Sequence, residues 1–316
     1  MNRTAVALFA VAALACSGCL DFDRQTMHIL MPQGRDELHA VFIYEGLHIN
    51  GSQQNHVARA KEELKDLVNG KALYLGNHML RFHLTELSDD RMKPLQTLLA
   101  KHLSLQDGVL FLDDRASLNA SQTIRIRELT AFVQGLNEFI AGEFAHSVAE
   151  QRLNPVGDFY DAETLALIER AIQDKHVWLS CEPGRISFTM PASDAVIARF
   201  KRQISGADDV DRLRSLADTM LPDGLAEFRK ALTEAAANRE TIAGLPWSFQ
   251  HGRKRFTVSL GVGEGEPLHL VCKSGTRMQA WDGELVNFAR NSQLPVRKDL
   301  TVQGQIEKLQ REVKDR

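Results

Sequence analysis

A stripe of apolar side chains between residues 129 and 148 constrains the fold of this chain more than any other feature. The apolar positions recur every three or four residues, which is the spacing of one helix face. A stripe this wide needs a partner surface to cover it. Its members are Leu129, Phe132, Val133, Leu136, Phe139, Ile140, Phe144 and Val148.

Strand patterns and helix patterns mix along the rest of the chain, so we predict an α+β fold. In this fold, short antiparallel hairpins or sheets pack against amphipathic helices. The expected strands span 25–31, 38–49, 72–75, 79–84, 108–112, 177–181, 186–190, 247–250, 255–260 and 268–272. Further helices are expected at 55–68, 95–103, 162–174, 193–204, 208–220, 225–238 and 302–316.

Two stretches, 57–103 and 161–205, share the order helix, hairpin and capped helix. A duplicated α-β-β-α unit would produce this correspondence. Coincidence would also produce it, because short strands and Ser-Asp helix caps are common. The alternatives differ in whether the two units superpose with the same handedness.

The chain has 316 residues, which is enough for about two domains. Residues 154–158 are rich in turn formers, and we place a linker at 154–160. This predicts an N-terminal α+β domain at 19–153 and a C-terminal α+β domain at 161–300. The remaining residues, 301–316, form a helical tail in this division.

The first eighteen residues have the pattern of a signal peptide. Arg3 supplies a positive charge, and an almost unbroken apolar run follows from residue 5 to residue 16. The run is shorter than the ~20 residues that a membrane-spanning helix needs. We therefore expect residues 1–18 to be removed during export.

The residues Ser17-Gly18-Cys19 resemble the lipobox of bacterial lipoproteins, although Cys16 stands where that motif usually has leucine. The resemblance implies that Cys19 receives a diacylglycerol with acyl chains such as palmitate, and that cleavage occurs just before it. A membrane partner, held through this lipid anchor, follows from the same resemblance. The alternative is ordinary secretion, with cleavage after Ala15, for example.

The sequence after Cys19 resembles the start of bacterial lipoproteins of unknown function, which open with an acidic Phe-x-x-Gln-Thr strand. Phe22, Gln25 and Thr26 match that pattern. The resemblance supports export and implies no activity. Leu20, rather than aspartate, follows Cys19, which favours the outer membrane over retention at the inner one. We expect a location in the cell envelope, facing the periplasm or the cell surface.

Two further cysteines, Cys181 and Cys272, lie in strand-like apolar runs. Two thiols in an oxidising compartment can pair as a disulfide. Two buried free thiols are the alternative.

Known catalytic spacings are absent from the sequence, including His-Glu-x-x-His, Gly-x-Ser-x-Gly, Ser-x-x-Lys and the phosphate loop. A net charge of −3 with dispersed signs predicts no nucleic-acid partner. No cofactor, metal ion or catalytic residue is therefore assigned. The weaker candidates fit turns, strands or helix starts better: Gly261-Gly263-Gly265, the basic cluster 251–255, His78 with His83, His269 with Cys272, and Asp208-Asp209-Asp211.

Two functional hypotheses remain. The first is a non-catalytic envelope lipoprotein that binds an unknown protein or envelope partner, or that serves in assembly. The second is a hydrolase or other enzyme whose site is assembled from distant segments. Its candidate residues are His83, His251, Asp113 and Asp114. A pocket in which titratable residues converge would favour the enzyme.

Overall fold

The computed structural model describes an α+β fold, as predicted. The residues that it describes are 15–17, 19–32, 34–75, 78–81, 93–153, 160–182, 184–204, 241–243, 247–261, 268–271, 279–281, 283–305, 307 and 311. The predicted helices at 208–220 and 225–238 lie outside these residues, as does most of the tail beyond 305.

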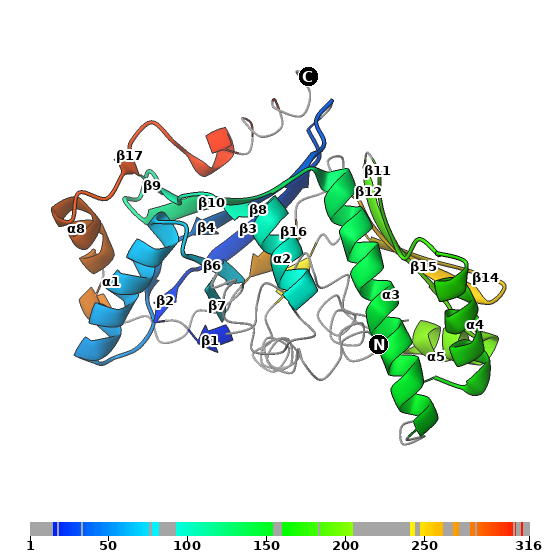
Figure 1. Ribbon diagram of the computed structural model, residues 1–316. Helices are drawn as coiled ribbons and strands as arrows, with labels where there is room; N and C mark the ends of the chain where they lie inside the picture. Colours follow the sequence, from blue (N-terminus) through cyan, green and yellow to red (C-terminus); the bar gives the residue numbers. More distant parts are fainter. Residues whose placement is uncertain are drawn as a thin grey trace.

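An eight-stranded sheet forms one side of the molecule (Figure 1). Its neighbours pair antiparallel except for the last two strands, which are parallel. The order across the sheet is β13 (Thr241–Ala243), β16 (Leu268–Val271), β3 (Arg24–Leu30), β4 (Glu37–Glu45), β10 (Leu118–Arg127), β9 (Val109–Leu112) and β17 (Val296–Arg297). The eighth strand, β8 (Leu103–Leu105), pairs with the end of β10.

Three smaller sheets complete the strand structure. A four-stranded antiparallel sheet has the order β11 (Leu179–Glu182), β12 (Arg185–Pro191), β15 (Arg255–Gly261) and β14 (Trp247–Gly252). A three-stranded sheet has the order β1 (Ala15–Ser17), β7 (His78–Arg81) and β6 (Ala72–Leu75). The short strands β2 (Leu20–Asp21) and β5 (His48–Ile49) pair with each other.

The longest described helix, α3 (Leu129–Leu153), lies between the eight-stranded and the four-stranded sheets (Figure 1). It packs against α2 (Lys93–His102) and β10 on one side, and against α4 (Ala162–Gln173) and β11 on the other. The predicted stripe is buried in one continuous core, with Val133 at its margin. The stripe on α3 therefore joins the two main sheets.

The remaining helices pack on the sheets or on each other. Helix α1 (Gln54–Val68) contacts β2, β5 and β6, and α5 (Asp194–Ile204) contacts β15. The 3-10 turn η3 (Gln279–Trp281) precedes α8 (Glu284–Asn291), which pairs with α1 through Lys61 and Glu284 at 2.8 Å. Among the described residues, no helix combines the length and the apolar character needed to cross a bilayer.

The two units proposed as a duplication have the predicted order. They are α1-β6-β7-α2 and α4-β11-β12-α5. Both hairpins are antiparallel and turn through two residues, since Leu75 pairs with His78 and Glu182 pairs with Arg185. Their outer partners differ, because β7 pairs with β1 whereas β12 pairs with β15. A common ancestry for the units stays a prediction.

The C-terminal part of the chain contributes to both large sheets. β13, β16 and β17 join the eight-stranded sheet, whereas β14 and β15 belong to the four-stranded one. Most of the predicted linker at 154–160 lies outside the described residues. The division into two domains at this linker stays a prediction. A domain boundary there would separate β13, β16 and β17 from the sheet in which they pair.

The strand predicted at 38–49 is divided at Gly46. The φ angle of Gly46 is +68°, and a Cβ atom there would lie 2.1 Å from the carboxylate of Asp23. Only glycine adopts this conformation without strain so close to another chain segment. The chain turns there from β4 into β5.

Candidate functional site around Cys19 and Glu63

The segment that begins at Cys19 enters the core directly. Cys19 is 8% exposed, and the next three residues are buried almost completely. Leu20 pairs with Ile49 between β2 and β5, and the Asn50 N–H donates to the Cys19 carbonyl at 2.8 Å. The residue predicted to carry a lipid is therefore the first residue of a well-anchored segment, with no spacer between it and the folded body.

The carboxylate of Glu63, on α1, holds this segment in place. Its Oε2 atom accepts hydrogen bonds from the backbone N–H of Cys19 and of Leu20, both at 2.7 Å. The same oxygen accepts a third bond from the Tyr74 hydroxyl at 3.2 Å. The Glu63 side chain is 1% exposed, so a buried carboxylate fixes the start of β2.

The second oxygen of Glu63 is less well satisfied. Arg59, one helical turn earlier, places Nε 3.2 Å from Oε1 as an ion pair, and its own side chain is 54% exposed. Among the described residues, Oε1 accepts no aligned hydrogen bond. A buried carboxylate oxygen normally has such a partner, so the site has unused capacity to accept one.

Burial changes the acidity of the groups at this site. It raises the pKa of Glu63, although the N–H groups of Leu20 and Cys19 and the charge of Arg59 act in the opposite direction. Burial, with the Glu63 charge adding to it, raises the pKa of the Cys19 thiol. Burial also raises the pKa of Tyr74 well above its usual range. The thiol of the folded chain is therefore protonated at neutral pH and is a poor nucleophile.

Aromatic residues and an amide hold Tyr74, which donates a hydrogen bond to Glu63. The Tyr74 N–H donates to the Tyr44 hydroxyl at 3.2 Å, and the Tyr44 hydroxyl donates to the Tyr74 carbonyl at 3.2 Å. The Gln25 amide donates to the same carbonyl at 2.6 Å. The Phe22 ring lies 5.3 Å from the Tyr44 ring, centroid to centroid. These contacts tie β3, β4 and β6 to the segment that follows Cys19.

Sequence analysis did not identify Glu63. It lies on the apolar face of α1, three residues after Ala60 and directly before Leu64. A charged residue on an otherwise apolar helix face is the signal that could have found it, because an ionised group is buried only where a partner compensates for it.

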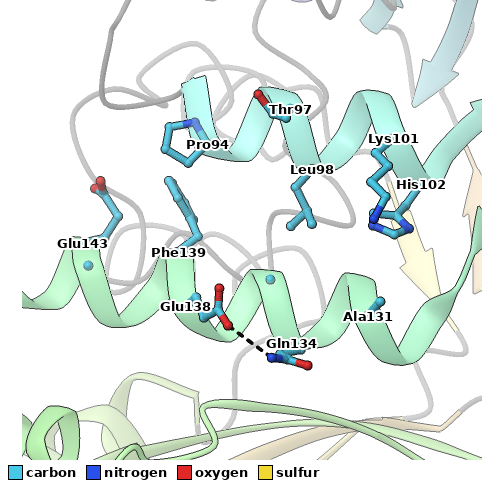
Figure 2. A pocket seen from close by; sticks show the side chains of 12 residues that line it. Pro94, Thr97, Leu98, Lys101, His102, Ala131, Gln134, Glu138, Phe139 and Glu143 are labelled. Carbon is cyan, nitrogen blue, oxygen red and sulfur yellow. Dashed lines mark hydrogen bonds between the residues drawn. The ribbon is translucent and has the colours of Figure 1, made fainter.

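A second candidate is a groove of about 630 Å³ between α2 and α3 (Figure 2). Leu98 and Phe139 contribute its apolar walls. Lys101 and His102 lie toward one end, and Glu143 lies toward the other (Figure 2). Glu138 lies between them, so the titratable groups are spread along the groove, which is unlike the convergent arrangement of a catalytic pocket (Figure 2).

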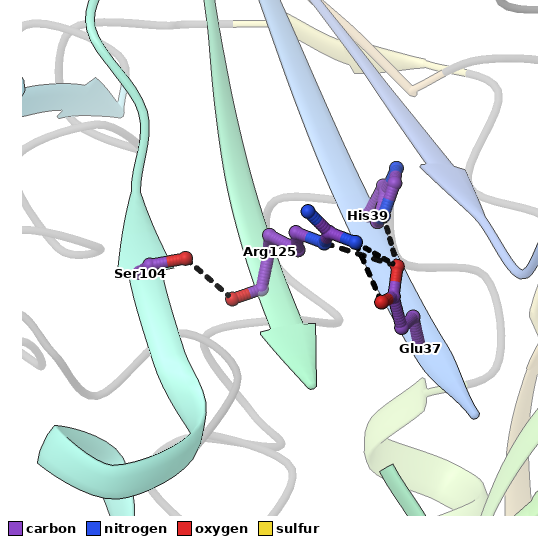
Figure 3. A network of polar contacts seen from close by, with 4 residues as sticks. All are labelled: Glu37, His39, Ser104 and Arg125. Carbon is purple, nitrogen blue, oxygen red and sulfur yellow. Dashed lines mark hydrogen bonds and ion pairs between the residues drawn. The ribbon is translucent and has the colours of Figure 1, made fainter. Parts of the chain in front are cut away.

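A third candidate is the polar network on the eight-stranded sheet (Figure 3). Arg125 on β10 donates to both carboxylate oxygens of Glu37 on β4, at 2.6 to 3.0 Å. His39 Nε2 lies 3.1 Å from Glu37, and the Ser104 hydroxyl donates to the Arg125 carbonyl at 3.5 Å. The Arg125 hydrogen bonds lower the pKa of Glu37. The network cross-links neighbouring strands, and its bidentate pair is already complete.

The residues proposed for an enzyme have separate positions. Asp113 accepts backbone N–H bonds from Arg115 at 2.9 Å and Ser117 at 2.8 Å, which stabilises the turn between β9 and β10. Asp114 is exposed in that turn, whereas His251 is exposed on β14 of the other large sheet. His83 lies outside the described residues. The described members of this set do not form one site.

The basic cluster at 251–255 forms the tip of the β14-β15 hairpin, as predicted. Lys254 places Nζ 2.7 Å from Glu163 and 3.4 Å from Asp194, which lie in the first turns of α4 and α5. These contacts dock the hairpin tip on both helices. The ammonium of Lys254 is therefore engaged within the protein.

The cysteine and histidine candidates are only partly described. Burial raises the pKa of the Cys181 thiol to about 11, and Cys272 lies outside the described residues. Their disulfide stays a prediction. The described residues contain no group of three or more metal-ligating side chains. The other partners of the weak motifs, Gly263, Gly265 and residues 208–211, lie outside the described residues.

Comparison of the chain with protein-family models, with curated proteins and with solved structures finds no match. The chemistry of the described residues therefore carries the functional argument. Among the candidate sites, the one around Glu63 contains Cys19, the residue with a predicted modification.

Proposed function

We propose that this protein is a lipid-anchored protein of the bacterial cell envelope, attached through Cys19, and that its α+β body is a non-catalytic binding or assembly module. The membrane is its partner through the anchor, and an unknown protein or envelope component is its partner through the body. The sequence pattern before Cys19 supports the anchor.

The observation that carries this proposal is the burial of Cys19 and of the three residues that follow it. Cleavage before Cys19 removes, among the described elements, only the edge strand β1. The segment from Cys19 onward keeps its bonds to Glu63 and Asn50. A buried and hydrogen-bonded segment thus follows the lipobox-like site directly.

The lipidation chemistry fixes the order of events. The Cys19 sulfur loses its proton and forms a thioether with a diacylglyceryl group, while the glycerophospholipid that donates this group loses its phosphate headgroup. The buried thiol of the folded chain is unsuited to this reaction, because its pKa is raised. Modification therefore precedes closure of the fold over residues 19–22.

Two acyl chains are sufficient to hold the folded body at a bilayer, because each buried methylene contributes about 0.8 kcal/mol. No spacer separates Cys19 from the body, so the anchor holds the face around Cys19 close to the membrane. Leu20 after Cys19 favours the outer membrane, with the body facing the periplasm or the cell surface.

A non-catalytic role is supported by the structural contacts that several described polar side chains make. Glu37, Arg125, Asp113 and Lys254 are each engaged in contacts that stabilise strands, turns or helix ends. The titratable groups of the α2-α3 groove are spread along its length. These residues do not converge on one site, as the catalytic residues of a hydrolase would.

Membrane fractionation with labelled palmitate tests the proposal. The wild type and a Cys181→Ser control are expected to incorporate label and to sediment with membranes. Cys19→Ser is expected to carry no label, and to be soluble or to remain as a full-length precursor. Palmitate incorporation into Cys19→Ser, or a soluble unlabelled wild type, would refute the anchor.

A further inference from the structure

The Glu63 carboxylate can accept more hydrogen bonds than the described residues of the uncleaved chain supply. All three bonds that it accepts, from Cys19, Leu20 and Tyr74, reach Oε2. The Oε1 atom has the Arg59 ion pair but no aligned hydrogen bond among the described residues. In the uncleaved chain, the nitrogen of Cys19 belongs to a peptide bond, so it is uncharged and has a single hydrogen to donate.

Cleavage before Cys19 changes this donor. Water adds across the peptide bond between Gly18 and Cys19, Gly18 leaves as a carboxylate, and the nitrogen of Cys19 becomes an ammonium with three hydrogens. That nitrogen already lies 2.7 Å from Oε2 of Glu63. One N–H of the ammonium can keep the existing bond to Oε2, and two further hydrogens become available to the neighbouring Oε1.

We propose that Glu63 is the receptor for the α-amino group created by this cleavage, and that the mature chain keeps the group as a free ammonium. The inference rests on the proposed function, because it requires cleavage before Cys19. It adds the chemical state of the mature N-terminus: a diacylglyceryl group on sulfur and no acyl group on nitrogen. Acylation of the nitrogen would return it to a neutral amide with one hydrogen, and the charge pair with Glu63 would be lost.

The surroundings of Glu63 favour a cation at this position. Among the described residues, the titratable and charged groups that face it are Arg59 on the same helix, Tyr74 on β6 and the Cys19 thiol. Arg59 is the one positive group among them, and its side chain is more than half exposed. A buried carboxylate is costly unless its charge is compensated, and an ammonium at hydrogen-bond distance from Oε2 would add to the compensation that the half-exposed Arg59 gives at Oε1.

The pairing changes how stability depends on pH. In the uncleaved chain the pKa of Glu63 is raised by burial, so stability is lost as pH rises through that pKa. In the cleaved chain the carboxylate raises the pKa of the ammonium above its ordinary value of about 8. The stability from this pair is then fully present below the ordinary amine pKa, and it is lost as pH rises through the raised one.

The pKa of the α-amino group in the mature lipoprotein tests this inference. The protein is purified from membranes in detergent, the amine is labelled by reductive methylation with ¹³C-formaldehyde, and its NMR signal is followed against pH. We expect the amine pKa of the folded wild type to lie at least about one unit above that of the same protein unfolded in urea, a tenfold change in proton affinity. Glu63→Gln is expected to remove this difference.

Glu62→Gln is the matched control, because Glu62 is the neighbouring carboxylate on α1 and is 69% exposed in a pair with Lys65. It is expected to leave the raised amine pKa unchanged. The comparison between folded and unfolded wild type decides the question even if Glu63→Gln fails to fold. An amine whose pKa is the same in both states would overturn the inference.

The mass of the N-terminal peptide separates this inference from the proposed function. A lipidated Cys19 whose nitrogen is acylated refutes the amine receptor and leaves the anchor standing. An unlipidated Cys19 that is N-terminal and has a raised amine pKa supports the receptor and refutes the anchor. Cleavage after Ala15 refutes both.

Discussion

The side-chain amide of Asn137 forms two hydrogen bonds with the backbone of Leu179. Asn137 Nδ2 donates to the Leu179 carbonyl at 2.8 Å, and the Leu179 N–H donates to Asn137 Oδ1 at 2.9 Å. The Trp178 N–H donates to the same oxygen at 2.7 Å. Asn137 thus binds the edge strand β11 as a neighbouring strand would, and it fixes the four-stranded sheet to α3.

Asn137→Ala is expected to lower the free energy of unfolding by about 2–3 kcal/mol, because three backbone groups of the edge strand lose their partners. Chemical denaturation measures the change. Gln134→Ala, three residues earlier on the exposed side of α3, is the control and is expected to change stability by less than about 0.5 kcal/mol. Equal effects of the two substitutions would show that Asn137 does not join α3 to the sheet.

Glu37→Gln is expected to destabilise the protein at neutral pH by about 1–2 kcal/mol, because Arg125 loses its charged partner. The Arg125 hydrogen bonds lower the pKa of Glu37. The stabilisation that ionised Glu37 gives the folded state is therefore fully present above the pKa of about 4.3 that Glu37 has in the unfolded chain. This stabilisation is lost as pH falls through the lower pKa of the folded state. Unfolding measured from pH 7 to pH 3 should show the difference between wild type and variant shrink. A difference that stays constant with pH would contradict the assignment, and Glu182→Gln, at an exposed position, serves as the control.

Tyr44→Phe is expected to cost about 1–3 kcal/mol in the free energy of unfolding, because the buried N–H of Tyr74 loses its acceptor. Thr97→Ala also removes a hydroxyl, but from an exposed position on α2, and is expected to have an effect below about 0.5 kcal/mol. Denaturant titrations of both variants measure the two costs. If Tyr44→Phe unfolds like the wild type, the Tyr44-Tyr74 pair does not support the Glu63 site.

Gly142→Ala is expected to stabilise the protein by up to about 1 kcal/mol, because alanine favours the helix and a Cβ atom there meets nothing within 4 Å. Gly135→Ala should lack this gain, since its Cβ atom would lie 2.5 Å from a methyl carbon of Leu98. Both glycines line the α2-α3 groove. Thermal unfolding of the two variants measures the difference, and an equal gain in both would mean that Leu98 moves freely in the groove.

Local periodicity was sufficient to predict several elements. The stripe from Leu129 to Val148 predicts α3 because its spacing is regular and its apolar side chains all need cover. The Ser193 hydroxyl accepts the Val196 N–H at 3.2 Å, as the predicted cap of α5 requires. The hairpin tip at Gly252 follows from a turn between two strand-like runs.

The central strand β10 was not predicted, although it pairs with β4, β8 and β9. Apolar and polar residues alternate along it except at Gln122, but Asn119, Ser121 and Gln122 are buried, so polar character does not mark a solvent-facing side here. The Gln122 amide donates to the carbonyls of Leu67 and Ala72, which come from distant parts of the chain. Such residues become compatible with burial only through partners that local patterns do not reveal.

The candidate site could be predicted only in part for the same reason. Cys19 is identified by the residues that directly precede it in the sequence. Glu63 is 44 residues away, and its contact with Cys19 depends on how α1 packs against β2. The sequence pattern therefore predicts the modified residue, and the tertiary structure adds the group that binds its backbone.

The mass of the N-terminal peptide, from protein isolated in the membrane fraction of its native host, tests the central claim most directly. We predict a peptide that begins at Cys19 and carries the added mass of a diacylglyceryl group on that residue. A peptide that begins upstream of Cys19, or a Cys19 without acyl mass, would contradict the lipid-anchored function.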